Sequence, residues 1–501
     1  MVTLIPINKP QVKHQMITFL IAILTLISGY FIYGKFIERF FGADDKIETP
    51  AIRLKDDVDF IVMPTWKMFT IQFLNIAGLG PIFGAILGAL YGPVAYIWIV
   101  LGCIFMGATH DYFSGMLSIR NDGSSFPEIV GKYLGTGFQN FLRIFTILLL
   151  ILVGVAFVTG PAGLLKDLTG GGFYFWLYGI FAYYLIATLL PINKIIGKIY
   201  PLFGAALLIM ALMIAGSMIL KSFDGSLHLT EISLSQLKNF HSNPGENILY
   251  PMMFIVISCG AISGFHSTQS PMMARCMKKE SYGRPVFFGA MIAEGIVTII
   301  WATAAMIYFG DTHALNSTML SGHNPAWVVN EICSSWLGKV GAIFAIIGVI
   351  ACPITTGDTA FRSARLTIAD MLRLKQGSIK SRLLISLPLF AIGFLLSQLE
   401  FSTIWKYLGL ANQILSMIML WIGAMYLAKN EKTHYILSLP ASFMTAICFT
   451  YLLVAPIKNG GLNISTSLGI SLGIVIAIIA FSLFKFKIRK KLKTQEIKIN
   501  S

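Results

Sequence analysis

The chain has 501 residues, of which 56% are hydrophobic and 12% are charged, and its formal net charge is +15. Because soluble domains carry roughly a quarter charged residues, this composition excludes an ordinary soluble protein. Apolar runs of about 18 residues or more recur along the chain, each long enough to cross a lipid bilayer as a helix. The strand-like alternation of a membrane β-barrel is absent. The sequence therefore predicts an all-α integral membrane protein.

Thirteen membrane-spanning helices are predicted, joined by loops too short to form a separate soluble domain. They cover residues 15–34, 65–91, 93–119, 140–163, 173–190, 199–220, 250–270, 286–309, 338–360, 382–398, 403–427, 433–455 and 464–486. The first lacks a small-residue cleavage site, so we interpret it as a retained helix. The cysteines form no close pair, which indicates neither a disulfide framework nor a zinc site.

Positive charge predicts the orientation. The loops alternate between two sides, and the N-terminal side holds eight of the 38 Lys and Arg residues, which leaves 30 for the other side. The eight are Lys9, Lys13, Lys166, Lys221, Lys238, Lys339, Lys406 and Lys458. Since cytoplasmic loops are enriched in Lys and Arg, we expect the N-terminus outside and the basic C-terminal tail in the cytoplasm. The charge follows this rule, so no nucleic-acid partner is predicted.

The second span contains the first of two predicted breaks, Ala-Gly-Leu-Gly-Pro at residues 77–81. Its glycines loosen the helix, and Pro81 removes a donor and disfavours helical backbone at Gly80. Unpaired backbone within a membrane is tolerated only where it is buried in protein or lines a cavity. We therefore expect Ala77, Gly78 and Gly80 to line a substrate site.

The seventh span contains the second break, in the stretch ISCGAISGFHSTQSP at residues 257–271. The candidate substrate-binding residues here are Cys259, Gly260, Ser263, Gly264, His266, Ser267 and Gln269. The alternative is that these small residues serve only close helix packing.

The two breaks lie five spans apart and so cross the membrane in opposite directions. Two inverted sets of five helices, each opening with a broken helix, are typical of secondary transporters that bind substrate at the midplane. The predicted divisions are an extra helix and cytoplasmic loop (1–64), a first repeat (65–220), an inverted second repeat (250–430), and two further helices with a basic tail (431–501). By analogy of architecture, this layout resembles the amino acid–polyamine–cation transporter fold.

Ionisable groups inside membrane spans are costly and usually functional. The candidates for coupling transport to an ion gradient are His110, Asp111, Glu294 and Asp358, with His266 also inside a span. A buried carboxylate is disfavoured as the anion, which suits Glu294 and Asp111 to proton exchange, so the sequence favours proton-coupled uptake. The alternative is that these groups only satisfy backbone or hydroxyl partners at helix ends.

The ninth span offers a rival coupling site. Thr355 and Thr356, together with free carbonyls around Ala77 and Gly78, are hard oxygen ligands of the kind that a sodium ion prefers. The alternative is that the threonine hydroxyls bond back to the preceding helical turn.

Several long motifs resemble the carbon starvation protein A family. They are FGADDKIETPA (41–51), IAGLGPIFG (76–84), FMGATHDYFSGMLSIRNDGSSFPEI (105–129) and ISCGAISGFHSTQSPMMARC (257–276). The resemblance implies a carrier of the bacterial inner membrane, with peptide uptake during carbon starvation or pyruvate uptake as its activity. Many members are longer at the C-terminus than this sequence, which lacks that extension.

We therefore predict a secondary transporter that imports small nutrients carrying a carboxylate, above all peptides, with pyruvate uptake by proton symport as the alternative. A channel or nutrient sensor is a minor alternative. Ser263 near His266 could suggest a hydrolase, but no supporting acid is evident, so no enzyme is predicted. No cofactor is expected beyond a coupling proton or sodium ion, and the oligomeric state stays open.

Overall fold

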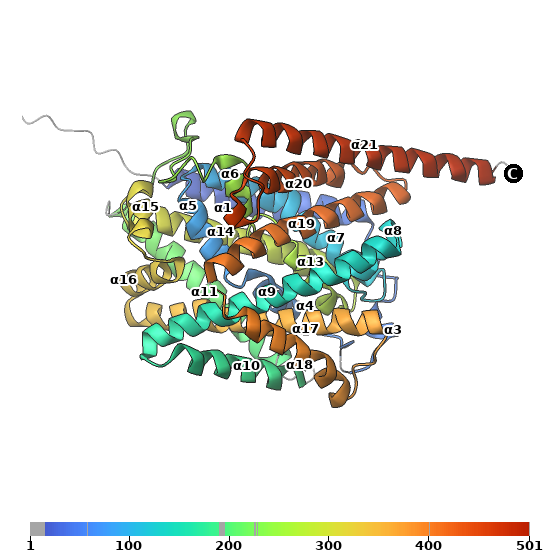
Figure 1. Cartoon of the computed structure of the whole chain (residues 1–501), viewed down its shortest axis with the longest axis horizontal. Coiled ribbons are helices and arrows are strands. Elements are labelled where there is room, and N and C mark those ends of the chain that lie inside the picture. The colour runs from blue at the N-terminus through green and yellow to red at the C-terminus, as the bar shows by residue number, and fades with distance from the viewer. Residues whose placement is uncertain are drawn as a thin grey trace, which may run out of the picture.

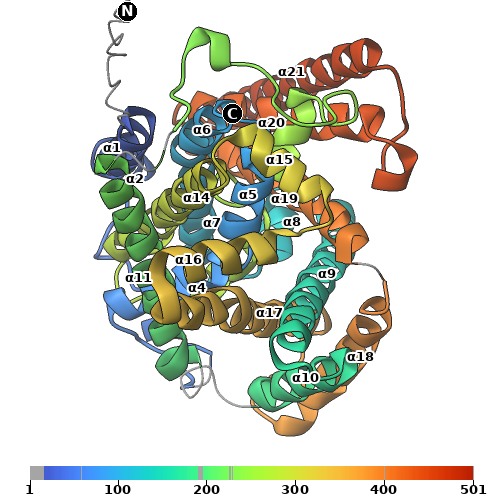
Figure 2. The same cartoon turned by 90° about the vertical axis from the view of Figure 1, so that its left-hand side faces the viewer.

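The computed structural model describes residues 16–57, 59–189, 196–224, 227, 229–399 and 401–499. Within these ranges all repetitive secondary structure is helical. The long helices lie side by side along the long axis of the molecule (Figure 1), and Figure 2 looks along many of them. Helices suit such a chain because each satisfies its own backbone hydrogen bonds, which lipid cannot do. The all-α membrane architecture is thus confirmed.

Nine helical segments in the described part of the chain are long and apolar enough to cross a membrane. They are Ile17–Phe41, Val94–Ile119, Thr136–Lys166, Tyr200–Phe223, Glu280–Tyr308, Ile379–Leu396, Tyr407–Lys429, Tyr435–Val454 and Thr466–Ile488. A bent pair, α4 (Thr65–Ala77) followed by Gly80–Ala89, is a tenth candidate.

The helices of the bundle follow one another in chain order. They are α1 (Ile17–Phe31), α2 (Tyr33–Phe41), α4, η1 (Gly80–Gly84), α5 (Ala85–Ala89), α6 (Val94–Leu101), η2 (Gly102–Gly107), α7 (Ala108–Ile119), α9 (Thr136–Thr169), α10 (Phe173–Leu189), α11 (Ile196–Phe223), η4 (Leu249–Met253), α12 (Phe254–Val256), α13 (Phe265–Ala274), η6 (Arg284–Phe288), α14 (Gly289–Tyr308), α16 (Pro325–Ile346), η7 (Ile347–Ala351), α17 (Cys352–Leu372), α18 (Ile379–Leu396), α19 (Phe401–Lys429), α20 (Tyr435–Val454) and α21 (Thr466–Ile499). Shorter helices outside it are α3 (Pro50–Arg53), α8 (Phe126–Leu134), η3 (Leu234–Gln236), η5 (Glu280–Tyr282), α15 (Thr312–Leu320) and η8 (Ile457–Asn459).

Three predicted spans differ from simple long helices. The segment predicted at 173–190 is the shorter helix α10, and the segment at 250–270 is interrupted between α12 and α13. The segment predicted at 338–360 is part of α16, η7 and α17, which continue to Leu372. The predicted span ends before the helix does, because the rest of α17 carries polar and charged residues, most of them buried. The count of thirteen and the five-plus-five division, with its boundaries, stay predictions.

The centre of the bundle is formed by α4, α7, α13, α14 and α17, which pack against one another. In Figure 2, α10 and α18 lie beside α9 at one corner, and α20 and α21 pair at another edge. Residues of α14 are almost entirely buried, whereas α21 exposes much of its apolar surface. A polar site at the centre is therefore shielded from lipid on all sides.

The loops form two groups, and the loops of each group are those that the distribution of Lys and Arg assigns to the same side of the membrane. At one end of the bundle, segments 40–63, 120–128 and 275–284 bond to one another. Segments 90–92 and 240–247 form the other group, joined through hydrogen bonds that include Asn316. Lys9 and Lys13 lie outside the described residues. Which end faces the cytoplasm stays a prediction.

Candidate functional site: two helix breaks and a buried polar cluster

Both predicted breaks are present, and they touch each other. α4 ends at Ala77, and the next helix, beginning at Gly80, is bent from it by 54°. The second break covers residues 257–264. A Cβ atom placed on Gly80 would lie 2.2 Å from the Cβ of Cys259. The backbone of the first break therefore lies directly against the second, at a distance that only glycine allows.

The first break follows from its sequence. In a regular helix the Ala77 carbonyl would accept a hydrogen bond from residue 81, but Pro81 has no N–H to donate. Gly78 has φ of 43° and ψ of −133°, a conformation that suits glycine. Residues 77 to 81 are all buried. The irregular backbone thus lies inside the protein, as the membrane environment requires.

Four ionisable side chains lie together beside the breaks, and none of them is exposed to solvent. His110 Nδ1 is 2.8 Å from Asp111 Oδ1, and His266 Nδ1 is 2.9 Å from Asp111 Oδ2. His266 Nε2 is 3.5 Å from Glu294 Oε2. The Gly260 N–H donates to Glu294 Oε1 over 3.1 Å. The fold thus joins side chains of α7, α13 and α14 and the second break into one polar cluster.

The electrostatics of this polar cluster are uneven. Among the described residues, neither carboxylate of the cluster is paired with a Lys or Arg side chain. Asp111 is held between two imidazoles, whereas Glu294 has one backbone donor and a longer approach to His266. Buried charges are costly unless they are paired. The polar cluster is therefore suited to binding a cation or a proton.

α17 reaches the first break through Thr356. Its Oγ1 lies 3.0 Å from the carbonyl oxygen of Leu74 on α4 and 3.1 Å from that of Cys352 on its own helix. Thr355 donates only to the Cys352 carbonyl, over 2.7 Å. Both threonines thus make the bond to the preceding helical turn that was expected as the alternative. The Thr356 hydroxyl lies, in addition, within hydrogen-bond distance of a carbonyl oxygen on α4, near Ala77.

Two of the predicted residues have other partners: Asp358 bonds to a tyrosine of α11, and Ser267 bonds within its own helical turn. Asp358 is buried on α17, where Tyr200 of α11 donates to its carboxylate. Ser267 donates to the carbonyl of Gly264 over 2.6 Å, within its own helical turn. In the described part of the chain, the hydrogen bonds of Asp358 and Ser267 do not link either residue to Glu294 of the polar cluster.

The other predicted residues of the second break are buried polar groups and one tightly packed glycine. Gln269 donates to Thr268 over 2.9 Å and leaves its carbonyl oxygen without a partner in the described part of the chain. The Gly264 N–H donates to the carbonyl oxygen of Asn412 on α19 over 3.0 Å. A Cβ on Gly264 would lie 2.4 Å from that same oxygen. This break is therefore fixed by α19 as well as by the first break.

The hydrolase alternative has no geometric support. Ser263 Oγ is buried and makes no hydrogen bond to another described residue. The imidazole of His266 does have an acid beside it, Asp111, which the sequence did not reveal. Its other nitrogen, however, faces Glu294 and not a hydroxyl. A nucleophile and its base are therefore not paired here.

Sequence reasoning missed Gln72 and Asn75, which precede the first break on α4. Both side chains are fully buried, and neither amide has a hydrogen-bond partner among the described residues. Buried polar groups are normally satisfied, so these two are candidates to bind a polar ligand. Their signal was visible in TIQFLNIAG, where two amides three residues apart share one helix face.

Comparisons with known proteins agree with this architecture. Residues 14–178, 165–340 and 326–451 match the family model described as Carbon starvation protein CstA. An uncharacterized membrane protein of Haemophilus influenzae is 43% identical over 61% of this chain and 95% of its own. The peptide transporter CstA of Bacillus subtilis is 26% identical over 84% of this chain and 87% of its own.

A solved structure gives the fold. Mhp1, a nucleobase-cation-symport-1 family transporter in a closed conformation with bromovinylhydantoin bound, matches with a TM-score of 0.51. The match covers 85% of this chain and 93% of Mhp1 at 15% sequence identity, and so concerns the fold alone. With the family match across most of its length, the chain belongs to the carbon starvation protein CstA family and is a multi-pass membrane transporter, not an enzyme.

Proposed function

We propose that the chain imports small nutrients that carry a carboxylate, chiefly peptides, by secondary transport across the bacterial inner membrane. Relatives in Bacillus subtilis and Escherichia coli bear the name peptide transporter CstA. The observation that carries the proposal is the contact between Gly80 and Cys259, which brings two broken helices together inside the bundle. Broken helices at a common centre are the usual substrate site of secondary transporters.

Substrate recognition is assigned to the breaks and the amides beside them. α13 begins at Phe265, directly after the second break, and the positive end of its dipole favours a carboxylate there. The unpartnered amides of Gln72 and Asn75 offer donors and acceptors for peptide groups. Pyruvate has a carboxylate but no peptide group, so peptides use these additional contacts better.

We propose sodium as the coupling ion, bound between α4 and α17. Thr355 and Thr356 hydroxyls, with the Leu74 and Ala77 carbonyls, supply only neutral oxygens, which suit a hard monovalent cation. Because this site joins the first break to α17, its occupation would stabilise one arrangement of the substrate site. Proton coupling through Glu294 and Asp111, which the sequence favours, is untested and remains the competing prediction.

The test is uptake into proteoliposomes that contain the purified full chain. Labelled di- and tripeptides and labelled pyruvate are offered under a sodium gradient at equal pH, then under a pH gradient without sodium. We expect peptide accumulation above the external concentration only with the sodium gradient. Accumulation driven by the pH gradient alone would overturn sodium coupling, and accumulation of pyruvate but no peptide would overturn the substrate. Equilibration without accumulation would indicate a channel.

A further inference from the structure

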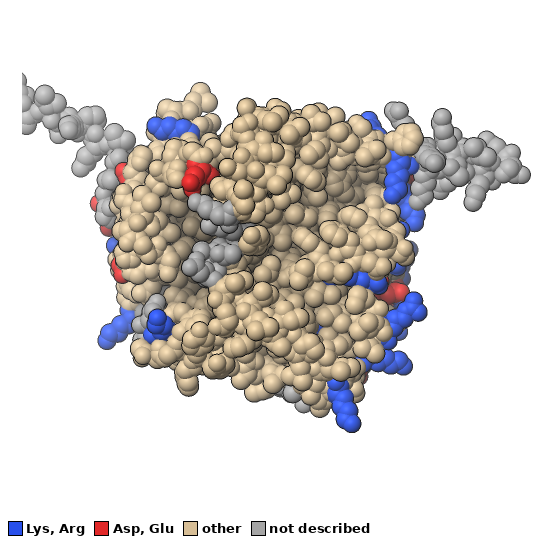
Figure 3. Space-filling model, viewed as in Figure 1, with Lys and Arg blue, Asp and Glu red and all other residues tan. Residues whose placement is uncertain are grey.

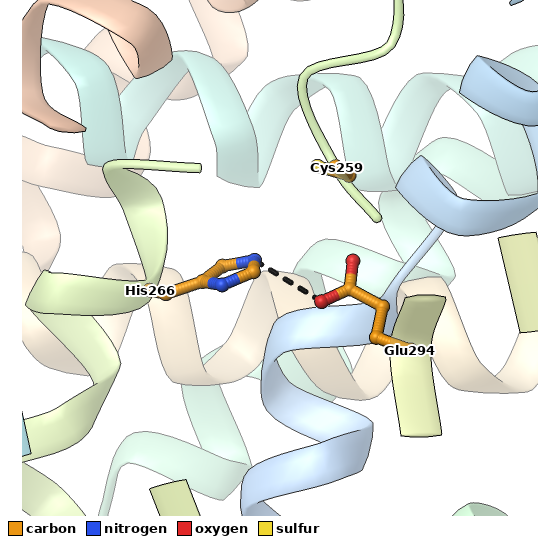
Figure 4. Close-up of side chains that lie close together, drawn as sticks. All are labelled: Cys259, His266 and Glu294. Carbon is orange, nitrogen blue, oxygen red and sulfur yellow. Dashed lines mark ion pairs between the residues drawn. The ribbon is translucent and has the colours of Figure 1, made fainter. Parts of the chain in front are cut away.

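A thiol, an imidazole and a carboxylate meet at the second break. The ligand atoms of Cys259, His266 and Glu294 all lie within 4.8 Å of one another. Figure 4 shows the imidazole and the carboxylate pointing toward each other, with Cys259 on the neighbouring loop. His266 Nε2 and Glu294 Oε2 are buried and face each other over 3.5 Å, the ion pair drawn in Figure 4, and neither makes a hydrogen bond to a described residue. Three potential metal ligands are thus directed into one space.

The surroundings orient these atoms as in known metal sites. Asp111 bonds to His266 Nδ1 over 2.9 Å, which directs the lone pair of the other nitrogen, Nε2, toward Glu294. A carboxylate bonded to the remote nitrogen of a histidine is the common support of a metal-binding imidazole. The Gly260 N–H holds Glu294 Oε1, so that Oε2 is turned toward His266 Nε2.

The separation of His266 from Glu294 and the local charge fit a divalent ion, and the Cys259 sulfur lies within 4.8 Å of both ligand atoms. Ligands about 2.0–2.3 Å from a tetrahedral zinc ion are roughly 3.3–3.8 Å apart, and His266 Nε2 lies 3.5 Å from Glu294 Oε2. A dication would also offset the two buried carboxylates, which have no Lys or Arg partner among the described residues. Cys259 is the least buried of the three ligands.

We propose that Cys259, His266 and Glu294 bind one divalent transition-metal ion, with Asp111 as the residue that positions His266. Thiolate, imidazole and carboxylate together suit zinc and its neighbours rather than magnesium or calcium. Three protein ligands leave a fourth position open, as in sites where a metal meets a substrate. If the proposed function holds, that position accepts the carboxylate or amine of the transported nutrient. The metal site itself does not depend on transport.

Cobalt(II) is the probe. The purified full chain in detergent is stripped with a chelator and titrated with cobalt, and then zinc is added. We expect one cobalt per chain, with a thiolate-to-cobalt charge-transfer absorption that zinc abolishes. Cys259→Ser should remove that absorption, whereas Cys448→Ser, a buried cysteine on α20, should keep it. Asp111→Asn should weaken cobalt binding by about 10–100-fold.

Two results would overturn the proposal: no saturable cobalt binding by the wild-type chain, or a charge-transfer absorption that persists in Cys259→Ser. If Cys259→Ser does not fold, Glu294→Gln decides through its cobalt affinity, which we expect to fall at least tenfold while unchanged affinity overturns the site. Peptide uptake is measured separately on the same preparation. Metal binding without uptake refutes the proposed function alone, and uptake without metal binding refutes the metal site alone.

Discussion

At the scale of the residue, the site depends on a few close approaches that only small side chains permit. Two of them are Gly80 against Cys259 and Gly260 against Thr298, where a Cβ would lie 2.2 Å and 2.0 Å from its neighbour. These glycines are visible in the sequence as helix-loosening residues. Which side chain each one meets is not, because the partners come from distant segments.

We predict that Gly80→Val reduces peptide uptake at least tenfold while the protein still inserts in the membrane. Its side chain cannot share space with Cys259 unless the two breaks separate. Uptake per molecule of membrane-inserted protein is the measurement. Gly216→Ala on α11 is the control, because a Cβ there meets nothing within 4 Å. Normal uptake by Gly80→Val would show that the contact is not needed.

A second prediction distinguishes a threonine hydroxyl that reaches α4 from one that bonds only within its own helix. Thr356→Val keeps the size of the side chain but loses the hydroxyl that reaches Leu74 on α4. We expect the sodium concentration for half-maximal uptake to rise at least fivefold, a free-energy cost of about 1 kcal/mol. Thr359→Val is the matched control, since Thr359 donates only to its own helix, at the Thr356 carbonyl. Equal shifts in both variants would contradict a sodium site at Thr356.

At the scale of the element, Arg275 at the end of α13 contacts three other segments of the chain. Its Nε donates to the Gly123 carbonyl over 2.9 Å, its guanidinium lies 3.6 Å from Asp370 at the end of α17, and it stacks over Phe60. The side chain is buried. Removing one member of such a buried arrangement costs far more than breaking an exposed pair.

We predict that Arg275→Gln loosens this end of the bundle and exposes Cys276. That thiol is buried, and burial raises its pKa to about 12, so it has almost no reactive thiolate at neutral pH. Alkylation by a maleimide should become at least tenfold faster in the variant. Arg53→Gln, which breaks the exposed pair with Asp122, should leave the rate unchanged. Alkylation as slow as in wild type would refute this role of Arg275.

The sequence predicts the helices better than it predicts the contacts between them. Hydropathy and the Gly-Pro pattern located the broken span at 65–91, because both signals are local. The predicted span stops before the end of α17 because charged residues such as Arg362 and Arg365 indicated the end of an apolar segment, although the structure buries them inside the bundle. The meeting of Cys259 with His266 and Glu294 depends on how α14 packs beside the second break, which no local pattern encodes.

At the scale of the whole molecule, the surface separates into an apolar band and charged ends. On the face shown in Figure 3, uncharged residues cover the middle, and Lys and Arg gather toward the two ends, most densely at the right. This division matches a bundle whose ends face water and whose sides face lipid.

The orientation of this bundle is the last prediction. We expect the end that holds segments 40–63, 120–128 and 275–284 to face the cytoplasm, because 30 of the 38 Lys and Arg residues are assigned to that side. The membrane potential and anionic lipids both retain Lys and Arg there. A fluorescent protein that matures only in the cytoplasm, fused after Ser501, should be bright, and alkaline phosphatase, which needs the periplasm, should be inactive at the same place. Fusions after Lys238, on the opposite side, should reverse both signals. An active phosphatase after Ser501 would require the inverted orientation, and the substrate would then enter from the other end of the bundle.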